Sequence, residues 1–228
     1  MKIRTINYIF LTIILLYSFA FIRFQEIDLG STNLLLDHNS YCKDFNRVVV
    51  SLIAYLATAL VIIYGVLSSI GYFCAKKNQT NFLSTNYQKY KQSFVFLFFN
   101  AVIVAGLLVE LIKNIFDRPR PHTINNFGGE NIYIGLWQTA NTCVTNCSFP
   151  SGDAAAGFLV FPIVFVLTKN LKLSFVLGTV AGLIISYCRI TLSKHFLSDV
   201  LFSFILVNYF ALISHALIYN RNKSSTHK

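Results

Sequence analysis

The sequence predicts an all-α protein that crosses a membrane six times as one helix bundle, with residues 1–228 forming a single domain. Hydrophobic side chains make up 55% of the 228 residues and charged side chains only 12%, too few charges to solvate a soluble protein of this size. The apolar residues fall into runs close to the ~20 residues that cross a bilayer. The basic residues gather in one set of connecting loops, so the net charge of +10 indicates membrane topology rather than nucleic-acid binding.

Six apolar runs are the expected spans, and the fourth and fifth are short enough to need their flanking residues. A cleaved signal peptide is the alternative for the first run, because that run is modest in length and follows Lys2 and Arg4. We expect an uncleaved helix, since no small-x-small cleavage site stands out and Arg23 closes the run abruptly. The runs are about Tyr8–Ile22, Val48–Cys74, Ser93–Ile115, Ser151–Thr168, Leu173–Cys188 and Phe196–Tyr219.

The loop charges predict which side of the membrane each segment faces. One set of loops and both termini carry basic residues without any Asp or Glu, which by the positive-inside rule is the cytoplasmic side. All the acidic residues lie within the spans or on the other side, so that side is expected to be periplasmic in a bacterial inner membrane. The cytoplasmic basic residues are Lys2, Arg4, Lys76, Lys77, Lys89, Lys91, Lys169, Lys172, Arg221, Lys223 and Lys228.

Three short polar segments, at residues 113–121, 150–153 and 189–199, interrupt the apolar pattern on the periplasmic side. They read Lys113-x6-Arg120-Pro, Pro-Ser-Gly-Asp153 and Arg189-x5-His195-x3-Asp. Charged groups at membrane depth face a protein interior or a wet cavity and are functional candidates. His195 and Asp199 are four residues apart and share a helix face, whereas Arg189 lies six residues before His195, so we expect a turn between two helices there.

The order of these motifs resembles the type 2 phosphatidic acid phosphatase superfamily of membrane lipid phosphatases. The resemblance covers about Leu107 to Val200 by motif and most of the chain by helix layout. Two positions depart from the family pattern: Cys188 stands where a Ser is usual, and Asp153 stands where a His is usual. Within the superfamily, the Cys-x3-Cys-Ser-Phe-Pro-Ser-Gly-Asp pattern is similar to the bacterial lipid A phosphatases, and above all to the 4′-phosphatases.

This resemblance implies a role for each motif residue. Histidine can act as a nucleophile in covalent catalysis, so His195 attacks phosphorus and carries a phosphohistidine, with Asp199 orienting its ring. Arg suits phosphate because its planar fork binds two oxygens at once. The scheme requires no metal and no cofactor. The residues expected to hold the phosphate are Lys113, Arg120 and Arg189 through their charges, and Ser151 and Gly152 through backbone N–H groups at a helix start.

Asp153 leaves several interpretations open. It donates the proton to the leaving oxygen only if it is protonated, and the nearby cations oppose that. Otherwise it holds a cation in place, and His122 or water donates the proton. Arg118 and Lys194 are either secondary site residues or anchors that extend to the headgroup level. Glu110 is expected to pair with Lys113, and His215 to pack inside the last span.

The periplasmic loop from Arg118 to Ser148 is long for a simple connection and is a candidate lid or substrate wall. Trp137 and Tyr133 are expected to anchor it at the headgroup level, with ordinary packing as the alternative. The compartment permits a disulfide between Cys143 and Cys147, for which Cys42 could compete. Two further ligands for a Cys-x3-Cys zinc site are absent from the sequence. Cys74 and Cys188 are interpreted as ordinary apolar residues, and the segment Phe24–Asn46 as an amphipathic loop.

We therefore expect a phosphoric monoester hydrolase whose partners are a phosphorylated lipid and the bilayer. The leading substrate is lipid A, at the periplasmic face. Undecaprenyl diphosphate and phosphatidylglycerol phosphate are the alternatives for the same chemistry. A lipid binder or transporter that retains a phosphate cage without catalysis is the alternative from another class.

Overall fold

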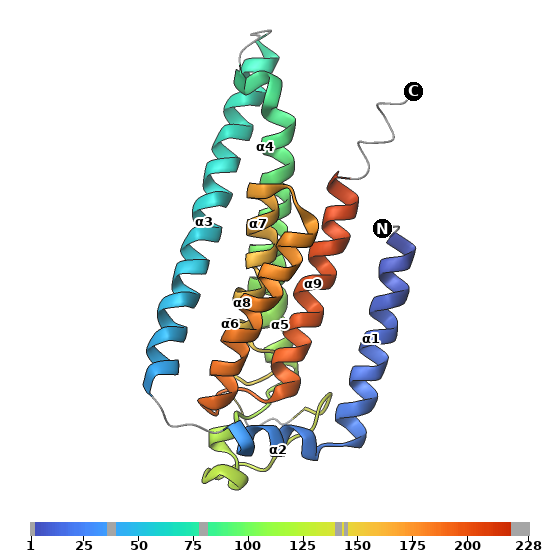
Figure 1. The fold of residues 1–228 in the computed structure, drawn as a ribbon, viewed down its shortest axis with the longest axis vertical. Coiled ribbons are helices and arrows are strands. Elements are labelled where there is room, and N and C mark those ends of the chain that lie inside the picture. Colours follow the sequence, from blue (N-terminus) through green and yellow to red (C-terminus); the bar gives the residue numbers. More distant parts are fainter. Residues whose placement is uncertain (1–2, 36–39, 78–81, 140–142, 144–145, 220–228) are drawn as a thin grey trace.

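The computed structural model describes residues 3–35, 40–77, 82–139, 143 and 146–219, and it is an all-α membrane protein (Figure 1). The α-helices are α1 (Ile3–Arg23), α2 (Glu26–Leu35), α3 (Ser40–Lys76), α4 (Phe82–Phe98), α5 (Val109–Phe116), α6 (Gly152–Phe158), α7 (Val160–Thr168), α8 (Leu171–Thr191) and α9 (Leu197–Tyr219). A π-helix, η1 (Phe99–Leu108), joins α4 to α5, and two 3₁₀ turns follow at η2 (Pro121–Thr123) and η3 (Asn125–Phe127).

Five of the described helical segments are long and apolar enough to cross a membrane. They are Ile3–Arg23, Cys42–Lys76, Phe82–Thr123, Leu171–Thr191 and Leu197–Tyr219. The fourth predicted run differs, because it forms a shorter apolar segment, Gly152–Thr168, divided between α6 and α7 at Leu159. The class of multi-pass all-α membrane protein is therefore confirmed, and the described residues supply five long spans rather than six.

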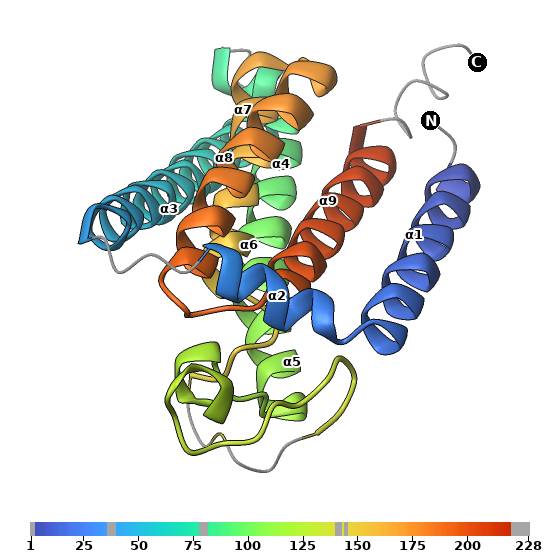
Figure 2. The ribbon, with the colours of Figure 1, turned by 60° about the horizontal axis from the view of Figure 1, so that its bottom comes forward.

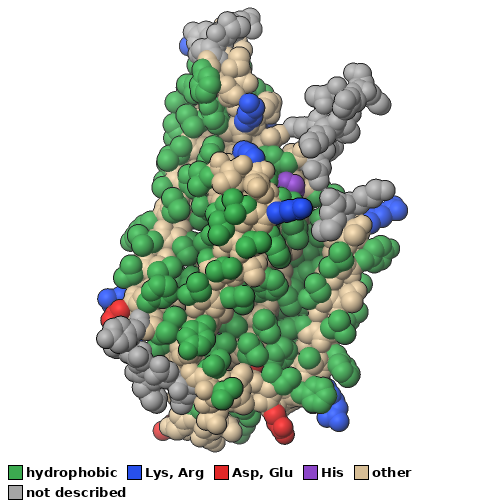
Figure 3. Space-filling model, in the orientation of Figure 1, with side chains coloured by type: hydrophobic (Ala, Val, Ile, Leu, Met, Phe, Trp, Pro, Cys, Tyr) green, Lys and Arg blue, Asp and Glu red, His purple; other side chains and the backbone are tan. Residues whose placement is uncertain are grey.

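The helices run mostly side by side, with the motif segments at one end, which we call the outer end. Figures 1 and 2 show α8 and α9 beside α6 and α7, with α1 against α9 and α3 paired with α4. The start of α1 and the end of α9 point to the same end of the bundle, opposite to the motif segments (Figure 1). In Figure 3, hydrophobic side chains cover the middle of the visible face, and most of the visible charges lie toward its two ends. This distribution is expected for a surface in contact with lipid.

The first motif is positioned by one continuous helical rod that comprises α4, η1 and α5. The rod ends where Asp117 adopts a left-handed backbone conformation, with φ of 45°, and its N–H donates to the Lys113 carbonyl at 3.0 Å. Lys113 therefore lies on the last turn, buried at the outer end of the rod. The chain then leaves the helix axis, which brings Arg118 and Arg120 toward the other motifs.

The segment expected to be a loop between the first two spans contains α2, so that expectation is wrong. This helix lies across the outer end of the bundle (Figures 1 and 2). Its Asp28 is fully buried and accepts hydrogen bonds from the backbone N–H and the hydroxyl of Ser198 at 2.8 and 2.6 Å. The second span also begins earlier than predicted, because α3 extends from Ser40, which adds two turns at the outer end.

The first helix packs as part of the bundle rather than apart from it. The Tyr17 hydroxyl of α1 donates to the Ser198 carbonyl at 3.0 Å, and Ser18 accepts from the indole N–H of Trp137 at 3.0 Å. Trp137 also packs edge-on against Phe149 and Phe202. Packing therefore accounts for Trp137 better than the expected headgroup anchoring, and the uncleaved first helix stays a prediction.

Glycines allow α8 to approach α6 and α7 closely. A Cβ added at Gly182 would lie 2.0 Å from the Phe158 ring, and one at Gly178 would lie 2.5 Å from the Phe161 Cβ. Both distances are far inside van der Waals contact, so these glycines set the spacing that aligns the second and third motifs.

We expect Gly182→Ala to destabilise the protein by about 1–3 kcal/mol, because the new methyl group must displace α6 from α8. The measurement is the thermal midpoint of the purified protein in detergent. Gly30→Ala is the matched control, since a Cβ there has no atom within 4 Å. Equal midpoints for the two variants would contradict the close helix contact.

Candidate active site

The fold brings the three motif segments together at one end of the bundle. Arg189 of α8 pairs with Asp153 of α6, with 3.0 Å between Nη1 and Oδ2. A Cβ at Gly152 would lie 3.4 Å from Lys113 Nζ, so the lysine reaches the start of α6. His195 in turn contacts Ser148, just before the second motif, through its Nδ1. The motif residues that the sequence singled out therefore lie in one site.

The loop between α8 and α9 turns as predicted between Arg189 and His195. The helix α8 ends at Thr191, and α9 begins at Leu197. The N–H groups of Lys194 and His195 both donate to the Arg189 carbonyl, at 3.0 and 3.3 Å. Ser193 takes a left-handed conformation with φ of 53°, which reverses the chain and directs His195 inward.

The His195 ring is buried and held by one nitrogen. Its Nδ1 lies 2.7 Å from the Ser148 carbonyl oxygen, which can only accept, so Nδ1 carries the proton and Nε2 keeps its lone pair. Burial, opposed by Asp199 and reinforced by the charges of Arg189 and Arg120, lowers the pKa of His195 to about 4. The imidazole is therefore neutral near pH 7, which is the state in which Nε2 can act as a nucleophile.

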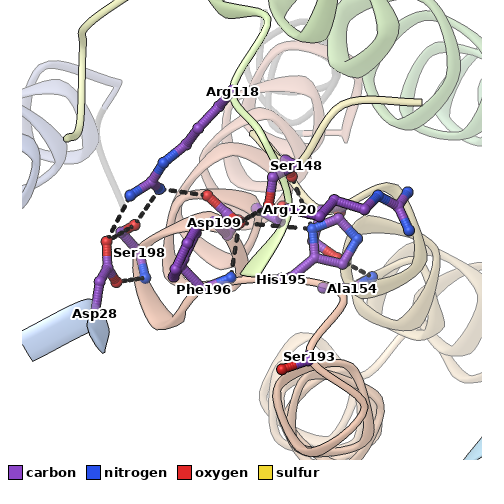
Figure 4. Close-up of polar contacts among 12 residues, drawn as sticks. Asp28, Arg118, Arg120, Ser148, Ala154, Ser193, His195, Phe196, Ser198 and Asp199 are labelled. Carbon is purple, nitrogen blue, oxygen red and sulfur yellow. Dashed lines mark hydrogen bonds and ion pairs between the residues drawn. The ribbon is translucent and has the colours of Figure 1, made fainter. Parts of the chain in front are cut away.

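Asp199 holds the loop between α8 and α9 through several bonds (Figure 4). Its Oδ2 accepts from the Phe196 backbone N–H at 2.8 Å and from the Ser148 hydroxyl. The same oxygen lies 3.6 Å from His195 Nδ1, which is too long for a hydrogen bond. Asp199 thus orients His195 chiefly through Ser148, whose carbonyl accepts the hydrogen bond from Nδ1–H.

A buried arginine lies between two aspartates behind this loop. Arg118 is 1% exposed, and its guanidinium donates to Asp199 at 2.6 Å and to Asp28 at 2.9 Å. The Phe196 ring lies beneath it, 4.4 Å from the guanidinium carbon to the ring centroid. Arg118 is therefore not a headgroup anchor, and that expectation is wrong. It contacts Asp199 from behind the loop, and its role as a secondary site residue stays a prediction.

Tyr133 also belongs to this buried group rather than to the headgroup level. Its hydroxyl donates to Asp28 and accepts from Arg118, both at 3.2 Å. Burial raises the pKa of Tyr133, and the neighbouring Asp28 raises it further. The hydroxyl therefore stays protonated and serves as a neutral donor to the carboxylate.

The three predicted phosphate ligands, Lys113, Arg120 and Arg189, differ in how many contacts hold their side chains in place. Lys113 has only a long contact of 3.9 Å to the exposed Glu110, so the predicted pair with Glu110 is weak. Arg120 donates to the backbone and side-chain oxygens of Asn146, at 2.8 and 2.5 Å. A cluster of cations with few acidic partners repels itself unless an anion binds, so the site is suited to phosphate.

Asn46, which sequence reasoning missed, completes the surroundings of Asp153. Its amide Nδ2 donates to Asp153 Oδ2 at 3.0 Å, the same oxygen that Arg189 contacts. Asp153 is thus a double acceptor that fixes Arg189 against α3. The two donors match the interpretation in which Asp153 holds a cation.

Ser151 is placed differently from its predicted role. Its hydroxyl caps α6 by accepting from the Ala154 N–H at 3.3 Å, and its own N–H donates to the Asp199 carbonyl, also at 3.3 Å. The Ser151 N–H is therefore engaged in joining α6 to α9. Gly152 is the first residue of α6, where a helix N–H has no partner within the helix, so the predicted phosphate contact fits Gly152 better.

The remaining candidates lie around the site. His122 bonds the third-motif loop, with Nδ1 2.9 Å from the Ser193 carbonyl. His215 packs against Phe165 and Tyr219 as expected. Cys143 and Cys147 form a disulfide. Cys188 is no ordinary apolar residue, because its Sγ lies 2.8 Å from that of Cys42.

Comparison with known proteins gives relatives of one kind. The family model described as the PAP2 superfamily matches residues 94–223. A lipid A 4′-phosphatase of Francisella tularensis subsp. novicida is 33% identical over 138 residues, covering 59% of this chain and 62% of that protein. A lipid A 4′-phosphatase of Rhizobium leguminosarum is 28% identical over 144 residues, covering 62% and 60%. The chain thus spans about three-fifths of the length of these curated relatives.

A solved structure supports the fold. The PAP2-type phosphatidylglycerolphosphate phosphatase from Bacillus subtilis superposes with a TM-score of 0.53 over 95% of each chain, at 18% identity. At this identity the likeness concerns the arrangement of the helices alone. The predicted family resemblance, which rested on the three motifs, is confirmed by the match over residues 94–223.

We expect Arg118→Met to destabilise the protein by about 3–5 kcal/mol, because it leaves Asp28 and Asp199 buried without their counter-charge. Thermal unfolding in detergent measures the loss. Arg23→Met, at an exposed arginine, is the control and should change the midpoint little. If the two variants unfold together, the buried ion pairs are not what stabilises the outer end.

Proposed function

The chain belongs to the PAP2 superfamily, and from that premise we propose that it hydrolyses a phosphate monoester of lipid A through a phosphohistidine intermediate. The observation that carries the proposal is the state of His195. Its Nδ1 is hydrogen-bonded to the Ser148 carbonyl, which leaves the lone pair of Nε2 free, and the charges of Arg189 and Arg120 act on the ring. Those cations are the groups that phosphoryl transfer needs, since its catalysis is mostly positioning and charge stabilisation.

The proposed reaction has two steps. The three cations bind the phosphate oxygens, and Nε2 of His195 attacks phosphorus while the bond from phosphorus to the lipid oxygen breaks. The lipid oxygen takes a proton and leaves as an alcohol. Water then attacks the phosphohistidine, which releases inorganic phosphate and restores the neutral imidazole. Burial of His195 favours this state, because its lowered pKa keeps the ring uncharged before the attack.

We assign Asp153 to positioning rather than to proton donation. Its Oδ2 contacts Arg189 and accepts from Asn46, so this oxygen is already engaged by two donors. A carboxylate held in this way can fix Arg189 beside the phosphate. The proton for the leaving oxygen then comes from His122 or from water.

Lipid A is the proposed substrate because the relatives that match in sequence are named lipid A 4′-phosphatases. The same names lead us to propose that the phosphate removed is the one at the 4′ position. Undecaprenyl diphosphate and phosphatidylglycerol phosphate would use the same cage. A binder without catalysis would keep the cations but would not turn over.

The test combines turnover with product analysis. Purified protein in detergent micelles is given lipid A, released phosphate is measured, and mass spectrometry identifies the dephosphorylated lipid. We expect His195→Ala to lose about 10³-fold or more of the rate, because the nucleophile is gone. His227→Ala, at a histidine of the C-terminal tail, is the control. Near-normal turnover by His195→Ala would exclude the phosphohistidine, and turnover of the other two lipids alone would exclude lipid A.

The role of Asp153 predicts how two substrates respond to Asp153→Asn. We expect kcat/KM to fall by the same factor for an alkyl phosphate and an aryl phosphate, because Arg189 is loosened in both cases. A general acid would matter only for the alkyl phosphate, by about 10²–10⁴-fold, since an aryl oxide leaves without help. Glu130→Gln, an exposed acid of the outer loop, is the control. A loss confined to the alkyl phosphate would assign proton donation to Asp153.

We further propose a six-span topology with both termini in the cytoplasm and the site in the periplasm. Here α6 and α7 together form the fourth crossing, with flanking residues completing its length. A reporter active only in the periplasm should give signal when fused after Gly128 and none when fused after Gln79. The reverse pattern would place the site on the cytoplasmic side and remove the proposed compartment.

A further inference from the structure

A pocket of about 390 Å³ lies beside the phosphate cage, between the outer end of α3 and the third motif. One wall carries Lys43, Asn46 and Arg47 of α3, and the facing wall carries Asp153, Arg189 and Lys194. We call it the α3 pocket. It shares Asp153 and Arg189 with the catalytic site, so a bound lipid could occupy both spaces. Lys43 and Arg47 have no part in the proposed reaction, whereas Asn46 contacts Asp153.

The α3 pocket has an excess of positive charge. Its lining contains four cationic side chains and one carboxylate, Asp153. That carboxylate is already engaged by Arg189 and Asn46. Arg47 has a contact of 3.8 Å to Asp44, but both side chains are at least 70% exposed, so solvent screens this pair. The remaining charge favours an anion in the pocket.

Two further observations indicate that an anion fits there. The pKa of Lys194 is lowered by burial and by the positive charges of Arg120, Arg189 and Lys43, so these cations lie close enough to repel one another. The Arg189 Nε is buried and has no hydrogen-bond partner among the described residues. A guanidinium N–H without an acceptor is costly to bury and is a ready donor to an anionic oxygen.

We propose that the α3 pocket binds a second anionic group of the same lipid molecule whose first phosphate lies in the cage. This inference rests on the proposed function, and it narrows the substrate class to lipids with two anionic groups in one headgroup. Arg189 lies between the two spaces and contacts the wall of both. Lys43, Arg47 and Lys194 then act as specificity-determining residues.

The test compares two synthetic glycolipids that differ only in carrying one or two phosphates. Initial rates of phosphate release in neutral detergent give kcat/KM for each. We expect the wild-type protein to prefer the lipid with two phosphates and the double variant Lys43→Gln/Arg47→Gln to lose about tenfold of that preference, mostly through KM. Lys76→Gln/Lys77→Gln removes the same charge at the other end of α3 and should keep the preference.

Two other outcomes would overturn the inference. An equal loss for both lipids would mean that the α3 cations support the cage in general. A loss that appears only when an unrelated anionic lipid is added to the micelles would mean that the pocket takes a neighbouring lipid. Direct binding of both lipids to the same variants separates this inference from the proposed function. If turnover is absent but the binding preference behaves as expected, the second anion site stands and the phosphatase proposal fails.

A separate observation concerns Cys42 and Cys188, which lie at the same end of the bundle as the Cys143–Cys147 disulfide. Their Sγ atoms are 2.8 Å apart, and both cysteines line one surface pocket. Cys42 belongs to the first turn of α3, and Cys188 directly precedes Arg189. A bond here would fix α3 to α8 beside the α3 pocket.

We infer that these thiols form a second disulfide in the mature protein. Two thiols lose two protons and two electrons as the sulfur–sulfur bond forms, and a thiol oxidant in its disulfide form accepts them and is reduced to a dithiol. The link would hold Asn46 of α3 against Asp153.

Mass spectrometry of the protein, purified without reductant after the free thiols are alkylated, tests this pairing. We expect a linked peptide that joins Cys42 to Cys188 and disappears on reduction. Alkylation of both cysteines without reduction, or a link from Cys42 to Cys143 or Cys147, would overturn it. Cys188→Ser should leave Cys42 alkylated, and Cys74→Ser is the matched control.

Discussion

The buried guanidinium of Arg118 is the constraint on which the outer end of this protein depends. It holds Asp28 of α2 on one side and Asp199 of α9 on the other. Removing one member of such a group leaves the other charge buried without a partner or water. The loss of stability is then far larger than if both charged groups were replaced by apolar side chains. The arrangement therefore forms as a whole, and it joins three segments that are distant in sequence.

The position of His195 follows from this constraint. Arg118 fixes Asp199, which accepts the Ser148 hydroxyl and the Phe196 N–H. Ser148 then presents its carbonyl to Nδ1 of the histidine. The cations of the proposed phosphate site have fewer partners, with Asp153 as the main acid among them. Bonds that hold the histidine from behind and excess positive charge in front of it are what the proposed role as phosphoryl acceptor requires.

Sequence reasoning located five of the six expected spans as long helices and singled out the motif residues, because charges are rare in an apolar chain and their spacing is conspicuous. It did not predict the partners that hold them. Asp28 looked like any acidic residue of an outer loop, and Asn46 lay before the predicted start of a span. Arg118 was ambiguous, because burial beside Asp28 depends on packing between segments far apart in the chain. The break at Leu159 was also hidden, since α6 and α7 form one apolar run by composition.

The contacts of α1 have a consequence for how the protein is made. Tyr17 bonds a carbonyl 181 residues later in the chain, and Asp28 bonds Ser198 across 170 residues. A ribosome releases the first helix long before the last one exists, so these two contacts cannot form until α9 has been made. A chain that stops before α9 would lack both Ser198 and Asp199, and the proposed nucleophile would lack the groups that hold its ring in place.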